Sequence, residues 1–481
     1  MTNEQSSFTI RNSRVVILGL ARQGTALARF LALAGAEVTV SDLQDEAALA
    51  DYLAELADLS IRYVLGEHPL SLLDEADLLC LSGGVPVDVP IVVEAQQRGI
   101  LLSNDAQIFL EQCPASVIGI TGSAGKTTTT ALVGEMCRAA GLRTWVGGNI
   151  GNPLIADLDR IRPGDWVVME LSSFQLEVMT VSPHIAAVLN VTPNHLDRHK
   201  TMEAYIAAKR NIVAHQRPEE FALLGYDDAN ARALALETAA HLLWFSGGAE
   251  VDEGAFRTNG ELTLRLGDAP SPRRPELVEG SKGSVDRVIC QASEVRLRGR
   301  HNLLNVLAAS ALAGLAGVPV EAMRQVATTF TGVEHRLELV RELNGVYWYD
   351  DSIATAPERS LAALRSFEEP IVILAGGRDK KLPWGEFADE TVRRARHLVT
   401  FGEAGPMIAR VVQNSQFAIR NSQFRLEGIT QVGTMEEAVA VAARLARPDE
   451  VVLLSPGGTS FDAFSDFAER GDKFKELVRG L

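Results

Sequence analysis

A glycine-rich turn followed by lysine and threonine is the feature of this sequence with the clearest chemistry. Residues 117–130 read VIGITGSAGKTTTT, so a β-branched run enters the turn TGSAGKT at 121–127. The strict phosphate-loop pattern has glycine where this chain has Ile120. The remaining glycines still let backbone N–H groups face an anion, and the next helix adds the positive end of its dipole. We therefore predict a nucleotide site in which Lys126 reaches the β- and γ-phosphates and the Thr127 hydroxyl holds Mg²⁺.

Three further residues could serve the same phosphates. Glu170 ends a predicted buried strand at 165–173, and a carboxylate at the carboxyl end of a parallel strand faces the ligand crevice. It is a natural Mg²⁺ ligand opposite Thr127. His195 follows another predicted strand, and Lys209 lies on a predicted helix. Alone, such a histidine or lysine is more often a surface residue. Together with the phosphate loop they indicate a metal and phosphate site.

A second glycine turn lies near the N-terminus. Residues 19–24 read GLARQG, which resembles the GxGxxG dinucleotide turn, and Asp42 follows about twenty residues later. Ala21 replaces the middle glycine, where the backbone must approach a pyrophosphate, so a nicotinamide-dependent oxidoreductase is disfavoured. Asp42 is instead suited to a hydroxyl of ribose or of another sugar nucleotide. Two such turns suggest ATP in one site and a nucleotide-tagged substrate in the other.

The elements that position these residues alternate strand with helix, which predicts an α/β fold with parallel, doubly wound sheets. The 481 residues are too many for one core. We expect three domains: a Rossmann-like N-terminal domain at 1–112, a central ATPase-like domain with the phosphate loop and a parallel sheet at 113–331, and a Rossmann-like C-terminal domain at 332–481. The Pro-, Gly- and charge-rich stretch 247–285 is predicted to be a loop or a disordered insertion.

Composition narrows the function classes. The formal net charge is −16 without a long basic run, so nucleic acid is a poor partner. The four cysteines have no metal-ligand spacing, which favours free thiols in a reducing compartment. Neither a signal-peptide pattern nor an apolar stretch of membrane-spanning length is found. We expect a cytoplasmic, monomeric enzyme. FTIRNS at 8–13 recurs as FAIRNS at 417–422, without the regular period of a solenoid, and is interpreted as a neutral surface insertion.

Several longer motifs point to one family. In chain order they are TGSAGKTT, GGNIGNP, ELSSFQLE, NVTPNHLDRH, YIAAK, GRHNLLNVLAA and GVEHRLE. With these motifs the chain resembles the Mur ligases over nearly its whole length. The pairing of ELSSFQLE with GVEHRLE and with the closing LLSPGGTSFDAF is most similar to the member that adds D-glutamate to UDP-N-acetylmuramoyl-L-alanine in peptidoglycan precursor synthesis. The resemblance implies domains for the UDP substrate and for ATP, and a mobile C-terminal domain that brings in the amino acid.

The implied chemistry is amide formation through an acyl phosphate. ATP would phosphorylate the carboxylate of the nucleotide-linked alanine, and the amine of glutamate would displace the phosphate. Such phosphoryl transfer depends on positioning and charge neutralisation rather than on a protein nucleophile. The resemblance also implies two Mg²⁺ sites. In the family, the lysine matched by Lys209 is carbamylated.

The resemblance assigns site residues by position. The catalytic set is Lys126, Glu170, His195 and Lys209. The metal ligands are Thr127, Glu170, His195 and Lys209. The ATP-binding set is Gly122, Ser123, Ala124, Gly125, Lys126, Thr127, Thr128, Asn302, Asn305, Arg336 and Asp351. The UDP-substrate set is Leu20, Ala21, Asp42, Ser82, Gly84 and Asn149. The glutamate set is Thr355, Lys380, Ser460 and Phe467.

One departure bears on the acceptor amino acid. The family often reads NDSKAT where this chain reads DDSIAT at 350–355, so Ile353 replaces a lysine on the glutamate side. Arg378, Lys380 or Lys381 would then have to supply the missing charge. A ligase of the same chemistry that uses L-glutamate is therefore an alternative. A folylpolyglutamate-type ligase leaves the N-terminal turn unused, and a non-enzymatic nucleotide switch leaves the cluster of Glu170, His195 and Lys209 unexplained.

Overall fold

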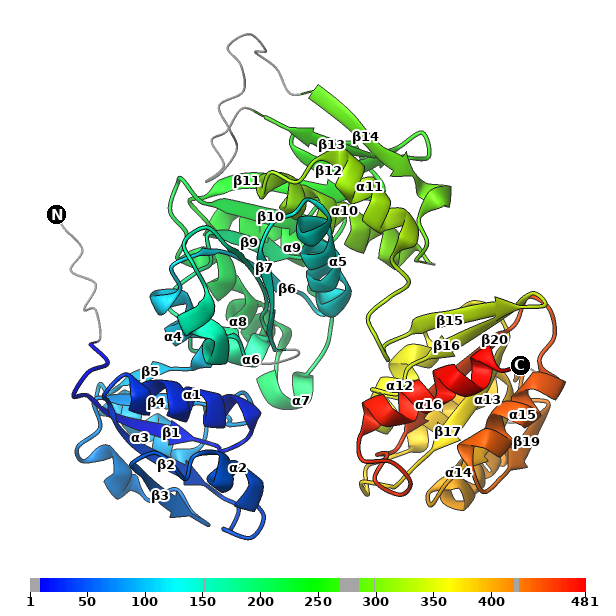
Figure 1. Cartoon of the computed structure of the whole chain (residues 1–481), viewed down its shortest axis with the longest axis horizontal. Coiled ribbons are helices and arrows are strands. Elements are labelled where there is room, and N and C mark those ends of the chain that lie inside the picture. The colour runs from blue at the N-terminus through cyan, green and yellow to red at the C-terminus, as the bar shows by residue number, and fades with distance from the viewer. Residues whose placement is uncertain (1–8, 150–152, 268–284, 298, 419–423) are drawn as a thin grey trace. The chain divides into compact units, whose positions relative to one another are not determined.

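The computed structural model describes residues 9–149, 153–267, 285–297, 299–418 and 424–481. By internal contacts the chain divides into two compact units, Met1–Thr329 and Phe330–Leu481. The first unit contains two sheets and the second contains one, and all three are built mainly from parallel strands with helices between them (Figure 1). The predicted α/β class is therefore confirmed. The predicted domain boundaries at 112/113 and 331/332 stay predictions.

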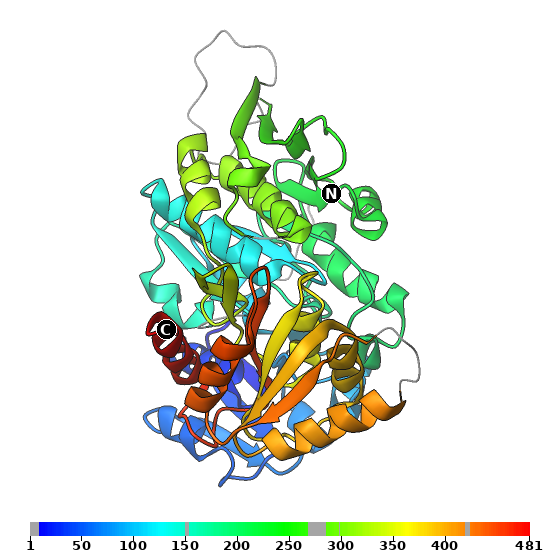
Figure 2. The same ribbon diagram turned by 90° about the vertical axis from the view of Figure 1, so that its right-hand side faces the viewer.

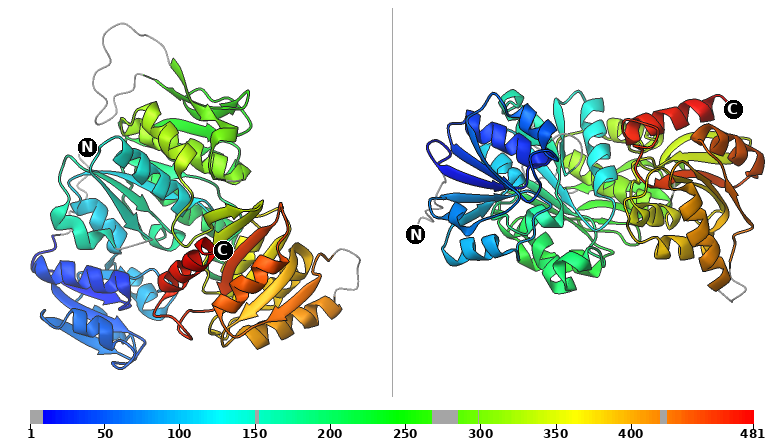
Figure 3. Two further views of the ribbon diagram at one scale, coloured as in Figure 1. Left: turned by 45° about the vertical axis from the view of Figure 1, so that its right-hand side comes forward. Right: turned by 90° about the horizontal axis from the view of Figure 1, so that it is seen from below.

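The N-terminal sheet has five parallel strands in the order β3-β2-β1-β4-β5. Its strands are β1 (Arg14–Leu18), β2 (Glu37–Asp42), β3 (Ile61–Leu65), β4 (Leu78–Leu81) and β5 (Leu101–Ser103). Its helices are α1 (Arg22–Leu33), α2 (Ala50–Glu55), α3 (Pro90–Gln97) and α4 (Asp105–Gln112), with a 3₁₀ turn at Leu70–Leu73. Leu18 pairs with both Ser41 and Leu81, so the carboxyl ends of β1, β2 and β4 are aligned (Figure 3).

The central sheet has nine strands in the order β14-β13-β12-β11-β10-β9-β6-β8-β7. Its strands are β6 (Ser116–Thr121), β7 (Thr144–Gly148), β8 (Trp166–Glu170), β9 (Ile185–Val188), β10 (Phe221–Gly225), β11 (His241–Ser246), β12 (Gly254–Thr258), β13 (Glu261–Leu266) and β14 (Val285–Gln291). The strands from β7 to β12 pair in parallel, whereas β13 is antiparallel to both β12 and β14.

Helices and short turns connect these nine strands. They are α5 (Lys126–Ala139), α6 (Ser173–Leu176), α7 (Leu196–His199), α8 (Met202–Ala214), α9 (Ala229–Ala233), α10 (Arg300–Leu315) and α11 (Val320–Thr329), with 3₁₀ turns at Leu154–Arg160, Leu234–Glu237 and Ala292–Glu294. Helices α5 and α10 pack against each other. The middle strands are buried apolar runs, as expected for parallel strands covered on both faces.

One sequence prediction about this sheet is wrong in part. The stretch 247–285, predicted to be a loop or a disordered insertion, contains β12 and β13, which form a hairpin. Asn259 and Gly260, both with positive φ, make the two-residue turn, and turns of this kind match the twist of the flanking strands. The polar composition of the whole stretch hides the short run of three buried residues in each of these strands. Residues 268–284, which hold the Pro- and charge-rich segment, lie outside the described residues.

The C-terminal unit has a six-stranded sheet in the order β15-β16-β20-β17-β18-β19 (Figure 2). Its strands are β15 (Glu338–Leu343), β16 (Val346–Asp350), β17 (Ile371–Gly376), β18 (Ala395–Phe401), β19 (Gly428–Gln431) and β20 (Val451–Gly457). Its helices are α12 (Pro357–Leu364), α13 (Gly385–Arg394), α14 (Gly405–Ala418), α15 (Met435–Leu445) and α16 (Phe467–Arg479). Within this sheet β15, at the edge, runs antiparallel to its neighbour, and the other strands pair in parallel. Of the repeated FTIRNS and FAIRNS segments, residues 8 and 419–422 lie outside the described residues.

No helix in the described ranges is both long enough and apolar enough for a membrane crossing. The four cysteines, Cys80, Cys113, Cys137 and Cys290, are free, as their spacing predicts. Three of them are buried.

Candidate active site

The turn after β6 has the geometry of an anion cradle. Gly125 adopts φ 85° and immediately precedes α5, so the N-terminal end of a 14-residue helix opens at the turn. A Cβ atom at position 125 would lie 2.3 Å from Asn305 Oδ1, so only glycine fits there. Lys126 Nζ donates a hydrogen bond to the carbonyl oxygen of Gly122 (2.9 Å) and thus curls back over the turn.

Sheet register brings Glu170 next to this turn. Ile120 pairs with Glu170 across β6 and β8, and Gly148 pairs with Glu170 on its other side. The buried Glu170 carboxylate accepts one hydrogen bond from Thr127 Oγ1 (2.7 Å) and one from Asn149 Nδ2 (2.9 Å). Three residues from separate segments, each singled out in the sequence, therefore meet at one carboxylate.

Lys209 of α8 lies beneath the same turn and is buried. Its Nζ donates to Thr121 Oγ1 and to the carbonyl oxygen of Gly122, both at 3.1 Å, and lies 4.8 Å from the centre of the Tyr205 ring. Burial lowers the pKa of Lys209 well below its usual value, and the charge of Lys126 lowers it further, while Glu170 opposes the shift. Since a neutral amine is the form that reacts with CO₂, this environment fits a carbamylated lysine.

His195 lies at the entry to α7, where it adopts φ 53°. Its ring packs against Phe174, with the centroids 5.1 Å apart, and its side chain is exposed. The helical turn α7 then presents Arg198, whose guanidinium lies 4.7 Å from the centre of the Phe174 ring and donates to the carbonyl oxygens of Gly84 and Val85 (3.1 and 2.6 Å). Gly84, predicted to bind the UDP substrate, is therefore tied to the segment that carries His195.

Sequence reasoning missed Asn190, which braces the phosphate turn, and His199, which packs against the segment after β8. Asn190 exchanges hydrogen bonds with the backbone of Ala124 (2.9 and 3.1 Å), and its carbonyl oxygen accepts from the N–H of Ser123 (2.9 Å). Buried His199 makes a 2.9 Å hydrogen bond with Ser173 Oγ and stacks on Phe174. Both residues belong to the NVTPNHLDRH motif, in which only His195 was predicted to be a site residue. The available signal for Asn190 was its position as a polar residue shortly after a buried strand.

Asn302 and Asn305 of α10 come from far along the chain to the same turn. Asn305 Nδ2 donates to Asn302 Oδ1 (3.0 Å), and Thr129 Oγ1 donates to Asn305 Oδ1 (3.4 Å). The long-range packing of α10 on α5 thus places Asn305 beside Gly125 of the phosphate turn, and Asn302 next to Asn305; their role in ATP binding stays a prediction.

The N-terminal turn brings together Leu20, Asp42 and Ser82. Asp42 Oδ2 accepts from the N–H of Leu20 (2.7 Å), and Ser82 Oγ donates to the carbonyl oxygen of Gly19 (2.8 Å). Gly24 must be glycine, because a Cβ atom there would lie 2.0 Å from that same carbonyl oxygen. Ala21 occupies the position before α1 without a side-chain cap, so the first N–H groups of this helix face the turn.

In the C-terminal unit, Asp351 follows β16 and is buried. It accepts hydrogen bonds from Ser455 Oγ (2.8 Å) and from the N–H of Leu337 (3.3 Å). Burial raises the pKa of Asp351 to about 7, although the Ser455 bond and the positive charge of Arg336 oppose that rise. The predicted nucleotide residues Arg336 and Asp351 therefore interact electrostatically.

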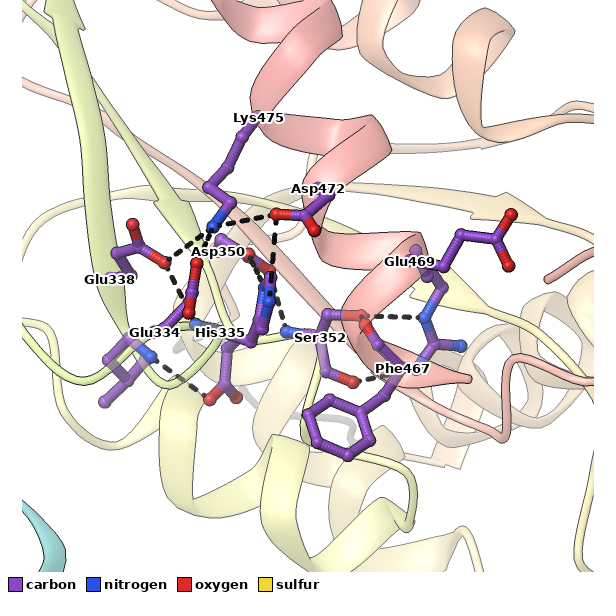
Figure 4. Close-up of polar contacts among 12 residues, drawn as sticks. Glu334, His335, Glu338, Asp350, Ser352, Phe467, Glu469, Asp472 and Lys475 are labelled. Atoms are coloured by element: carbon purple, nitrogen blue, oxygen red, sulfur yellow. Dashed lines mark hydrogen bonds and ion pairs between the residues drawn. The ribbon is translucent and has the colours of Figure 1, made fainter. Parts of the chain in front are cut away.

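A polar network fixes the backbone beside Asp351 (Figure 4). The neighbouring Asp350 makes a 2.8 Å contact with His335 Nδ1 and accepts from the N–H of Ser352 (2.9 Å). Buried Arg470 of α16 donates to both the hydroxyl and the carbonyl oxygen of Ser352 (2.9 and 2.8 Å). The ammonium of Lys475 lies 2.9, 3.1 and 3.4 Å from carboxylate oxygens of Glu334, Asp472 and Glu338, so it offsets part of their negative charge and ties α16 to the segment before β15.

The predicted glutamate residues lie in the same unit. Lys380 Nζ donates to Thr355 Oγ1 (3.5 Å). Phe467 begins α16, its carbonyl oxygen accepts from Ser352 Oγ (2.7 Å), and its ring is partly exposed. Ser460 is buried and its carbonyl oxygen accepts from the N–H groups of Ala463 and Phe464. The structure links Lys380 to Thr355, and it links Phe467 to the turn before α12.

Comparison with known proteins identifies the family. Three family models match: the Mur ligase MurD-like N-terminal domain at 13–103, the Mur ligase middle domain at 120–313, and the Mur ligase glutamate ligase domain at 335–458. The UDP-N-acetylmuramoylalanine–D-glutamate ligase of Symbiobacterium thermophilum is 42% identical over 97% of this chain and 98% of its own. The enzyme of the same name from Acetivibrio thermocellus is 39% identical over 98% and 97%.

Solved structures share the fold. The UDP-N-acetylmuramate-alanine ligase MurC of Thermotoga maritima matches with a TM-score of 0.52 and 20% identity, over 97% of this chain and 99% of that one. MurF of Acinetobacter baumannii matches with a TM-score of 0.53 and 18% identity, over 96% and 93%. The three family models, together with relatives that are about 40% identical over the full length, show that the chain belongs to the Mur ligase family.

Proposed function

We propose that this ligase joins D-glutamate to UDP-N-acetylmuramoyl-L-alanine, with ATP as the phosphoryl donor, in peptidoglycan precursor synthesis. The observation that carries the chemistry is the convergence of Thr127, Glu170 and Lys209 on one phosphate turn. The substrate assignment is taken from full-length relatives that carry the name UDP-N-acetylmuramoylalanine–D-glutamate ligase. A catalytic serine or cysteine is not needed for this reaction.

The first step transfers a phosphoryl group. A carboxylate oxygen of the nucleotide-linked alanine attacks the γ-phosphorus of ATP, and the bond to the ADP oxygen breaks. Backbone N–H groups at the start of α5 and the Lys126 ammonium neutralise the phosphate oxygens, and positioning of this kind supplies most of the rate enhancement in phosphoryl transfer. Asn302, Asn305, Arg336 and Asp351 hold the rest of the nucleotide.

The second step forms the amide. The amine of glutamate attacks the acyl carbon, inorganic phosphate leaves with the bonding electron pair, and the amine loses a proton. Leu20, Ala21, Asp42, Ser82, Gly84 and Asn149 hold the UDP substrate. Thr355, Lys380, Ser460 and Phe467 hold glutamate.

The residues present fit a divalent cation. The Thr127 hydroxyl and the Glu170 carboxylate are oxygen ligands 2.7 Å apart, which is the donor type Mg²⁺ prefers. A carbamylated Lys209 would add a second anionic oxygen ligand, and His195 a nitrogen. Two Mg²⁺ ions bound there would neutralise charge on the transferred phosphoryl group.

The test is phosphate release in an assay of four components. Release should require ATP, Mg²⁺, UDP-N-acetylmuramoyl-L-alanine and D-glutamate together, and omission of any one should remove it. L-Glutamate in place of D-glutamate, and a folate in place of the UDP substrate, are the comparison arms. Release with L-glutamate but not with D-glutamate would contradict D-glutamate as the acceptor. Release with a folate but not with the UDP substrate would contradict the proposed substrate class.

A further inference from the structure

The turn that joins β16 to α12 lacks the charge that a dianionic amino acid needs. Ile353 stands there, where the family often has lysine. Its backbone is fully engaged in the turn: the N–H donates to the carbonyl oxygen of His335 (3.1 Å), and its own carbonyl oxygen accepts from the N–H of Thr355 (2.8 Å). The side chain is half-buried and apolar. A cation must therefore reach this turn from elsewhere if glutamate binds beside it.

Arg359 reaches the same turn. It is the third residue of α12, and its Nη1 donates to the carbonyl oxygen of Ile353 (3.4 Å). A guanidinium carries five N–H donors in a planar fork suited to carboxylates, and this bond uses only one of them. The helix begins with Pro357 and has no side-chain cap, so its positive end also opens at the turn.

Lys380 approaches the turn from the other side, where it donates to Thr355 Oγ1. Burial lowers the pKa of Lys380, and the nearby charge of Arg359 lowers it further. In the part of the chain that the structure describes, neither cation is in an ion pair. Two like charges held close together without a counterion repel each other, and a bound carboxylate would relieve that repulsion.

One of the other cations that the sequence offered for this role, Arg378, already has an acidic partner. Arg378 Nε forms an ion pair with Glu403 at 2.8 Å. Its charge is therefore largely balanced before any substrate arrives.

We propose that Arg359 binds a carboxylate of the acceptor glutamate and, with Lys380, replaces the lysine missing at position 353. Arg359 is then a specificity-determining residue, supplied from α12 six residues downstream of the position the family uses. This inference rests on the proposed function and assigns a residue that the family resemblance did not.

The test distinguishes loss of the positive charge from damage to the fold, because a second substitution returns a cation to position 353. Arg359→Gln should raise the KM for D-glutamate roughly tenfold or more, the cost of losing one charge-assisted contact at a partly exposed site. The KM values for ATP and for the UDP substrate should not change. Adding Ile353→Lys to Arg359→Gln should restore most of the glutamate affinity, because the lysine returns to the family position. Arg359→Lys should be milder than Arg359→Gln.

Arg365→Gln is the matched control. Arg365 ends the same helix but lies 3.7 Å from Glu390, and its loss should leave the KM for glutamate unchanged. An unchanged KM for glutamate in Arg359→Gln would overturn the inference, as would a double variant no better than Arg359→Gln. If wild-type protein shows no glutamate-dependent phosphate release, the proposed function fails instead, so the two failures are distinguishable.

Discussion

Asn305 Oδ1 occupies the space that a side chain at position 125 would need, since a Cβ atom built on Gly125 would lie 2.3 Å away. The glycine of the phosphate turn is thus required by a residue from a distant helix, α10, as well as by its own positive φ. A side chain at position 125 should therefore disturb the phosphate site by displacing Asn305 of α10.

Gly125→Ala should lower kcat by about 100-fold, because displacement of Asn305 by an ångström or more misplaces the phosphate site. Gly141→Ala is the control: Gly141 also has a positive φ (76°), but a Cβ atom there would have nothing within 4 Å. The control should cost only about 1–2 kcal/mol of stability. Steady-state kinetics and thermal unfolding of both variants separate the two effects. Equal activity losses would contradict a role for Asn305.

Glu170→Gln should lower kcat by roughly 10²–10³-fold, since the amide keeps the shape of the side chain and removes the anionic ligand. Thermal stability should fall by only about 1–3 kcal/mol, because the amide oxygen still accepts the 2.7 Å bond from Thr127, whereas the amide nitrogen cannot accept the bond from Asn149. The exposed Glu203→Gln, on the first turn of α8, is the control. Near-normal turnover of Glu170→Gln at saturating Mg²⁺ would rule out a metal role.

Lys209 should carry a carbamate. Its lowered pKa favours the neutral amine, the form that reacts with CO₂, so incubation with ¹³C-bicarbonate should give a carbamate ¹³C resonance in the wild-type protein. Lys209→Gln should lack that resonance and lose activity, whereas Lys473→Gln, at a partly exposed lysine of α16, should retain both the resonance and the activity. A wild-type spectrum identical to that of Lys209→Gln would contradict the assignment.

The substrate-free protein should become less stable as the pH rises toward 7. The folded-state pKa of Asp351, about 7, exceeds its ordinary 3.8, so the native protein holds this proton more tightly than the unfolded chain does. The stabilising contribution is complete below pH 3.8 and is lost as the pH rises through 7, by about 1.4 kcal/mol per unit.

Asp351→Asn should flatten this pH dependence in thermal unfolding of the C-terminal unit between pH 5 and 8. The exposed Asp389→Asn, on α13, should keep the pH dependence of the wild-type protein. An unfolding temperature that varies with pH equally in both variants would contradict the buried, protonated state of Asp351.

The features of the fold and site that could be predicted are those encoded by residues close together in the sequence. The phosphate turn, the strand ending at Glu170 and the helix carrying Lys209 are each encoded within a few residues, and parallel pairing puts the carboxyl ends of such strands together. Among the strands that escaped prediction, β3 is only half-buried and β5 has three residues, so neither shows a long apolar run.

Contacts between distant segments could not be predicted from pattern alone. The hydrogen bonds of Asn190 to Ala124 and of Arg470 to Ser352 depend on sheet register and on the packing of a helix, which no short window of sequence contains. The family resemblance placed Asn305 near ATP, but its fit against Gly125 required the packed structure.

The central claim is transfer of a phosphoryl group to a substrate carboxylate. The most direct measurement uses UDP-N-acetylmuramoyl-L-alanine labelled with ¹⁸O in the alanine carboxylate, incubated with the enzyme, ATP, Mg²⁺ and D-glutamate. Mass spectrometry of the products should find one ¹⁸O atom in the released phosphate and one in the new amide. Phosphate without ¹⁸O, released at the same rate as the amide forms, would contradict the acyl-phosphate account.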